Sequence, residues 1–77
     1  MTMGERIKGR RLELKIKGAV LARSIGVTRH VLYKYESGIV INMPIDVLLK
    51  LCSELKICPN ELLGWDEYIL ENRDKAN

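Results

Sequence analysis

The sequence is poor in the residues that carry most enzymatic and metal chemistry. It has one histidine and two cysteines, and Cys52 and Cys58 lie six residues apart with no second pair. Because zinc sites combine several such ligands at short spacings, we expect no metal and no other cofactor. The sequence also has no Gly-rich phosphate loop and no carboxylate pair in a cleft-forming context, so we expect no enzymatic activity. The pattern around Cys52 instead predicts burial as a small apolar side chain.

Long apolar runs and linkers are absent as well. The longest uncharged apolar stretch, residues 38–45, is too short to cross a bilayer. No basic segment followed by an apolar one opens the chain, so we expect a cytoplasmic protein. There is no internal repeat, low-complexity tract or Gly/Ser-rich linker in the 77 residues. That length leaves room for one domain.

Charge is present but divided unevenly along the chain. Residues 1–38 contain nine Lys and Arg against three Glu, a net charge of +6, whereas residues 39–77 contain four against seven, a net charge of −3. The total of +3 conceals this division. A basic first half indicates a polyanionic partner for that half of the molecule.

Apolar residues recur at helical spacing between single Gly, Pro and capping residues, which predicts an all-α fold. The expected helices cover residues 5–14, 18–25, 29–37 with Thr28 as N-cap, 44–55 and 59–63. Residues 66–75 form either a sixth helix or a frayed tail. The apolar positions of these patterns, expected to face inward, are Ile7, Leu14, Leu21, Ala22, Ile25, Val31, Leu32, Tyr35, Ile45, Leu48, Leu51, Cys52, Leu55, Leu62 and Leu63.

Residues 18–37 meet the requirements of a helix-turn-helix. Ala22 is small where a second helix must cross closely, and Gly26 permits a sharp turn four residues later. Val27, Leu32 and Tyr35 can then close the space between the two helices. A unit of this kind places its second helix in the major groove of DNA while the first helix crosses the backbone.

Three stretches together resemble the phage-repressor (lambda and Cro) type of helix-turn-helix regulators, also called the xenobiotic-response-element type. They are GERIKGRRLEL, VLARSIGVTRHVLYKYESG and PIDVLLKLCSELKICPNELLG, within roughly Met3 to Gly64. The resemblance implies a compact five-helix, lambda-repressor-like DNA-binding domain over residues 1–64, with a tail or short extra helix over 65–77. It also implies a homodimer and sequence-specific binding of a near-palindromic double-stranded operator. We therefore expect a transcriptional regulator, and repression rather than activation.

The same correspondence assigns base contacts to the third predicted helix. The side chains concerned are Arg29, His30, Tyr33 and Lys34. Helical spacing independently places these four positions on one face, opposite the apolar positions of that helix. An arginine there can grip guanine through two hydrogen bonds. The alternative is a solvated basic face without a nucleic-acid partner.

Contacts to phosphate are expected at the start of the second predicted helix, where the sequence departs from the family. Relatives usually have Ser or Thr followed by Gln, whereas this chain has Lys17 and Gly18. A side chain that contacts DNA in the family is therefore missing, although the lysine charge and the glycine backbone can replace it. Further candidates for phosphate contacts are Lys8, Arg23, Thr28 and Ser37.

Arg11 and Glu36 match a charged pair that in the family joins the first helix to the end of the third. We expect a structural, partly buried salt bridge. The alternative is an exposed pair worth less than about 1 kcal/mol.

The segment GIVINM is the second departure, because relatives often carry Lys or Arg there. Three successive apolar residues cannot all face one small core, so some are expected to be exposed and to form a partner surface. The predicted dimer interface comprises Ile39, Val40, Ile41, Met43, Trp65, Tyr68 and Ile69. The alternatives are packing of the segment under the fourth helix, and a different function, in which this segment and the acidic tail bind protein as in an antitoxin or antirepressor.

Overall fold

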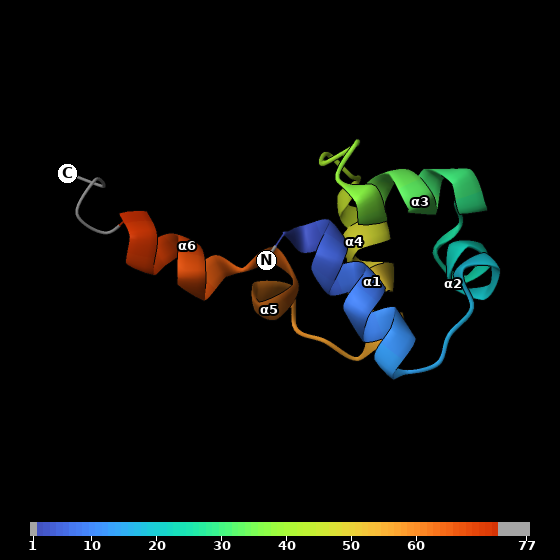
Figure 1. The fold of residues 1–77 in the computed structure, drawn as a ribbon, viewed down its shortest axis with the longest axis horizontal. Coiled ribbons are helices and arrows are strands. Elements are labelled where there is room, and N and C mark those ends of the chain that lie inside the picture. Colours follow the sequence, from blue (N-terminus) through green and yellow to red (C-terminus); the bar gives the residue numbers. More distant parts are fainter. Residues whose placement is uncertain (1, 73–77) are drawn as a thin grey trace.

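The computed structural model describes residues 2–72, without the side chains of Asp66 and Glu67, and contains no strand in that range. Its helices are α1 (Met3–Glu13), α2 (Gly18–Ile25), α3 (Arg29–Ser37), α4 (Ile45–Leu55), α5 (Pro59–Leu63) and α6 (Trp65–Asn72). α1 packs against α3, α4 and α5, while α2 packs against α3 and α4 (Figure 1). The all-α prediction is confirmed. No helix in the described range is long and apolar enough to span a membrane.

The first helix begins two residues earlier than predicted. The Glu5 backbone N–H donates to Thr2 Oγ1 (3.2 Å), and the Thr2 N–H donates to Glu5 Oε1 (3.1 Å). Each residue thus satisfies an otherwise unpaired donor of the other, which fixes the start of α1 at Met3. The hydrogen bond from the Thr2 backbone is the main reason that the pKa of Glu5 is lowered. The predicted range 5–14 was wrong because this reciprocal cap was overlooked.

Local signals place α2 and α3 where the sequence predicts them. Gly26 ends α2 in the left-handed conformation (φ 79°), which costs glycine little. Thr28 Oγ1 then accepts a hydrogen bond from the Val31 N–H (3.2 Å) and caps α3. Gly38 ends α3, again with a positive φ (80°). The two helices are therefore bounded independently of the rest of the fold.

The core lies between the first five helices. Its buried members are Ile7, Leu21, Ala22, Ile25, Leu32, Tyr35, Val47, Leu51, Cys52, Leu55 and Leu62. Leu14, Val31 and Leu48 are partly buried and pack against it. Burial of Cys52 is confirmed and raises the pKa of its thiol, whereas the thiol of Cys58 is exposed.

Two predicted core positions are wrong. Ile45 is 70% exposed, while Val47, which was overlooked, is only 7% exposed. The buried face of α4 is centred on residues 47, 51 and 55, whereas Ile45 is the first residue of α4 and lies at the flank of that face, two turns before Cys52. In α5, Leu62 is fully buried and Leu63 is 49% exposed, since a single turn presents only one side to the core.

The last helix lies apart from this core. α6 packs mainly on α5 and extends away from the other helices, at the orange to red end of the chain in Figure 1. The Trp65 and Tyr68 rings stack with their centroids 5.6 Å apart, and both side chains remain exposed. Of the two alternatives for residues 66–75, a helix is therefore found as far as Asn72, and the continuation to Lys75 lies outside the described residues.

Candidate nucleic-acid interface

The helix-turn-helix is held together by a small apolar contact between α2 and α3. Leu21, Ala22 and Ile25 of α2 are buried, as are Leu32 and Tyr35 of α3. The Val27 N–H donates to the Ala22 carbonyl oxygen (3.0 Å), so the turn itself is tied to α2. This packing fixes the orientation of α3 and therefore of the face that α3 presents to solvent.

The exposed face of α3 carries the predicted base-contacting residues. Arg29, His30 and Tyr33 are exposed, and Lys34 is half-buried. Tyr33, with a 58% exposed side chain, lies on the opposite side of α3 from buried Leu32 and Tyr35. A polar and cationic helix face of this kind can hydrogen-bond to base edges and to phosphate oxygens.

The start of α2 lacks a side-chain cap, as the sequence departure implies. Lys17 is extended and makes no capping hydrogen bond, and Gly18 begins the helix. Beside it lies a hollow of about 170 Å³, formed by α1, α2 and α3. Its lining residues are Lys8, Arg11, Gly18, Arg29, Leu32, Tyr33 and Glu36. The structure thus brings together two predicted phosphate residues, Lys8 and Gly18, with two predicted base residues, Arg29 and Tyr33.

Arg11 and Glu36 form a two-pronged ion pair at this hollow. Arg11 Nε donates to Glu36 Oε2 (2.8 Å) and Arg11 Nη2 donates to Oε1 (3.2 Å). Arg11 Nη1 also donates to the Ile16 carbonyl oxygen (3.1 Å). Both charged side chains are at most 13% exposed. The pair joins α1 to the end of α3 and supports the helix that carries the polar face.

The remaining predicted phosphate residues are dispersed. Thr28 Oγ1 caps α3, and the Ser37 hydroxyl donates to the Lys34 carbonyl oxygen (3.3 Å). Arg23 is exposed in the last turn of α2, apart from the hollow's lining.

Comparison with known proteins agrees with this geometry. The family model of the Cro/C1-type HTH DNA-binding domain matches residues 6–67. The chain belongs to this family. The P22 c2 repressor, solved with a synthetic operator in the presence of Tl+, is 35% identical, with a TM-score of 0.76 over 82% of this chain and 94% of that one. A SinR–SinI protein complex contains a chain of similar fold (24% identity, TM-score 0.74, covering 97% of this chain and 82% of that one). No curated protein sequence matches.

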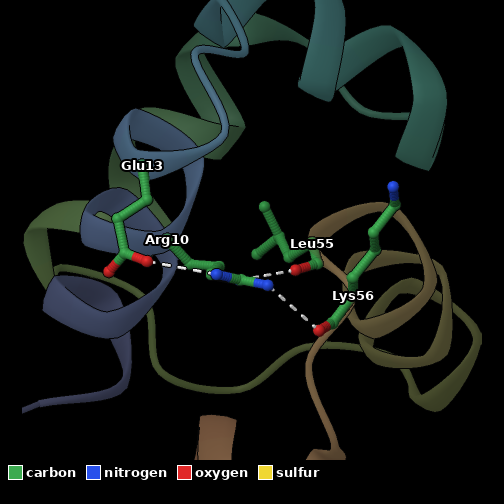
Figure 2. Close-up of polar contacts among 4 residues, drawn as sticks. All are labelled: Arg10, Glu13, Leu55 and Lys56. Atoms are coloured by element: carbon green, nitrogen blue, oxygen red, sulfur yellow. Dashed lines mark hydrogen bonds and ion pairs between the residues drawn. The ribbon is translucent and has the colours of Figure 1, made fainter.

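The Cro/C1-type domain has a support for α4 that the sequence did not reveal. Arg10 Nε donates to the Leu55 carbonyl oxygen (2.8 Å) and Nη2 donates to that of Lys56 (3.4 Å), while Glu13 Oε2 accepts from Nη1 (3.1 Å) (Figure 2). The guanidinium thus satisfies carbonyl groups at the end of α4. These partners are 45 and 46 residues from Arg10 in the sequence, so no local sequence pattern predicts the contact.

The apolar segment after α3 is only partly available to a partner. Ile39 and Ile41 are exposed, Ile41 by 72%. Val40 and Met43, which were predicted to lie in the same interface, pack instead against the core. Ile45 and Leu49, on α4, are also exposed, which was not predicted. They add two exposed apolar side chains directly after this segment in the sequence.

The Cro/C1-type domain carries its second apolar surface on α6. Trp65, Tyr68 and Ile69 are exposed there, as predicted for an interface, and so is Leu70. This helix extends away from the other helices on the side of α5, whereas the segment after α3 lies at the end of α3 (Figure 1). The two groups of predicted interface residues therefore form two surfaces of one subunit rather than one continuous surface.

Proposed function

We propose that this Cro/C1-type domain is a dimeric transcriptional repressor that inserts α3 of each subunit into the major groove of an operator. The observation that carries the proposal is the exposed face of α3, with its polar and cationic side chains, held rigidly on α2 by a buried apolar contact. In such a unit the second helix reads bases while the first contacts the backbone. A repressor acts on DNA, so we place it in the cytoplasm, with no cofactor and no catalytic role.

The individual contacts follow from this placement. His30, Tyr33 and Lys34 are proposed to contact base edges, and Lys17 and the backbone of Gly18 to contact phosphate. Thr28, Ser37 and Arg23 are further phosphate contacts in the proposal. Support comes from the operator named for the P22 c2 repressor, whose chain is 35% identical. A bound dimer that covers an operator can exclude polymerase without any additional domain.

Selection of bound sequences from random duplex DNA tests the function. We expect a near-palindromic motif with half-sites about 34 Å apart, bound less tightly as salt rises because counterions are released. Selection repeated with His30→Ala should give the same motif with one position relaxed in each half-site, at a cost of about 1–3 kcal/mol. Failure of the unaltered protein to enrich any motif would exclude the repressor function.

Substitution in the segment after α3 tests the dimer. Ile41→Asp places a charge on a 72% exposed side chain, so we expect an intact fold and a shift from dimer to monomer in analytical ultracentrifugation at micromolar concentration. Leu12→Asp is the matched control, because Leu12 is 57% exposed on α1 and lies outside the proposed interface. If Ile41→Asp remains as dimeric as Leu12→Asp, the segment is not part of the interface.

A second function remains a candidate because of the same apolar surfaces. The start of α2 has no side-chain cap, and several large apolar side chains are exposed, namely Ile39, Ile41, Trp65, Tyr68, Ile69 and Leu70. An antitoxin or antirepressor that binds protein through these surfaces would have both features. The DNA selection distinguishes the two functions, since a module that binds only protein yields no motif.

A further inference from the structure

The hollow beside α2 has a feature that its predicted residue roles do not explain. A Cβ atom added at Gly18 would lie 3.6 Å from Arg29 Nε and 3.9 Å from Arg11 Cζ. The side chain of Arg29 therefore lies against the first residue of α2, on the side of α3 that faces α1. In this position its guanidinium borders the hollow, together with Lys8 from α1.

The charges at this hollow are only partly compensated. Glu36 accepts two hydrogen bonds from Arg11, and the third prong of Arg11 is bound to the Ile16 carbonyl oxygen. The side chains of Lys8 and Arg29, by contrast, make no hydrogen bond or ion pair within the described part of the chain. Two cationic side chains from different helices thus border one small space whose one carboxylate, Glu36, is already paired with Arg11.

We propose that Arg29 and Lys8 together bind one phosphate of the DNA backbone at this hollow, and that Gly18 makes room for the Arg29 side chain. The inference rests on the proposed function and changes the expected role of Arg29 from reading a base to positioning the domain. Guanidinium groups bind phosphate oxygens through paired, charge-assisted hydrogen bonds. The hollow shares Tyr33 with the exposed face of α3, so a duplex held on that face has its backbone nearby.

This arrangement also explains how the chain manages without a side chain at residue 18. A larger residue at this position would occupy the space that Arg29 now uses. Gly18 and Arg29 therefore act as a pair, in which the missing side chain of α2 is replaced by one from α3. A hydrogen-bond donor beside the start of α2 is retained, but it comes from a different helix and carries a positive charge.

Arg29→Ala tests the role directly. We expect the selected motif to stay unchanged, while binding to the operator and to unrelated duplex weakens by the same factor of about ten. The slope of log affinity against log salt should become shallower by about one, because one phosphate contact is lost. Arg29→Lys, which keeps the charge but not the paired hydrogen bonds, should bind more tightly than Arg29→Ala and less tightly than the unaltered protein. A motif relaxed at one position, with unrelated duplex bound as before, would overturn the proposal.

Gly18→Leu tests whether the space beside residue 18 is needed for the Arg29 side chain. An added Cβ meets only ordinary van der Waals contacts, so the domain should fold. Arg29 Nε lies nearer to that position (3.6 Å) than Arg11 Cζ (3.9 Å), so we expect a leucine side chain to displace Arg29 and to weaken binding to all duplexes equally. Gly9→Leu is the same change on α1, where an added Cβ has no heavy atom within 4 Å, and it should bind as the unaltered protein does. Circular dichroism is the check that both variants fold. Equal binding by folded Gly18→Leu and Gly9→Leu would overturn the role of Gly18.

Failure of this inference differs from failure of the proposed function. If the unaltered protein binds no duplex, the repressor function is excluded and the phosphate site with it. If the unaltered protein selects a motif and Arg29→Ala alters that motif, the repressor function stands and only the phosphate site is excluded.

Discussion

Replacement of Gly4 by alanine is expected to destabilise the domain by about 3 kcal/mol. An added Cβ would lie 2.5 Å from the Tyr35 carbonyl oxygen and 2.8 Å from the Glu36 carbonyl carbon. These are backbone atoms at the end of α3, so no side-chain rotation relieves the overlap, and α1 must move away from α3. A domain of this size has a total free energy of unfolding of only about 4–12 kcal/mol. The variant should therefore unfold at a much lower urea concentration or temperature than the unaltered protein.

Gly9→Ala is the control, because it makes the same change in the same helix. An added Cβ at Gly9 meets no heavy atom within 4 Å, so only the helix propensity changes. Alanine is favoured over glycine in a helix interior by about 1 kcal/mol, and this variant should therefore be more stable than the unaltered protein. A shift of both variants in the same direction would contradict close packing of α1 against α3 at Gly4.

The predictable part of the fold is the part that local residues determine. Gly26, Thr28 and Gly38 set the limits of α2 and α3 through backbone conformation and one side-chain cap, and these limits were predicted from the sequence. The cap formed by Thr2 and Glu5 is equally local. It could have been predicted from the spacing of a threonine and a glutamate three residues apart.

The unpredictable part depends on contacts between distant residues. Gly4 is required because α3 passes close to it, and Arg10 binds carbonyl groups 45 and 46 residues away. Burial of Val47 instead of Ile45 depends on how α4 is rotated against α1 and α2. Ile45 and Val47 are both apolar and lie two positions apart in α4. Apolar spacing alone therefore does not determine which of the two faces the core.

The same distinction applies to the candidate interface. Helical spacing predicts which residues of α3 share a face, and the exposure of Arg29, His30 and Tyr33 agrees with it. Spacing does not predict the direction of a long side chain, however. Arg29 lies against Gly18, a contact between two helices that depends on the absence of a side chain at residue 18. The proposed role of Arg29 in binding phosphate therefore follows from its contact with α2 in the structure and not from helical spacing.

Removal of the Glu36 charge is expected to have the second large effect on stability. In Glu36→Gln, Arg11 keeps its charge in a site where its side chain is 13% exposed, but it loses a carboxylate that accepts two hydrogen bonds. Breaking a largely buried ion pair in this way costs about 3 kcal/mol, mainly because the remaining charge stays poorly solvated. Urea denaturation should show a lower midpoint with an unchanged slope.

Glu13→Gln makes the same change in an exposed ion pair. Glu13 accepts from Arg10 at 3.1 Å, but its side chain is 67% exposed, so water replaces the lost interaction and the cost should be below about 1 kcal/mol. The double variant Arg11→Met/Glu36→Gln removes both charges and should recover part of the stability lost in Glu36→Gln, because no unpaired arginine remains. Equal effects of Glu36→Gln and Glu13→Gln, or no recovery in the double variant, would show that α1 and α3 are held together by apolar packing, with the ion pair contributing little.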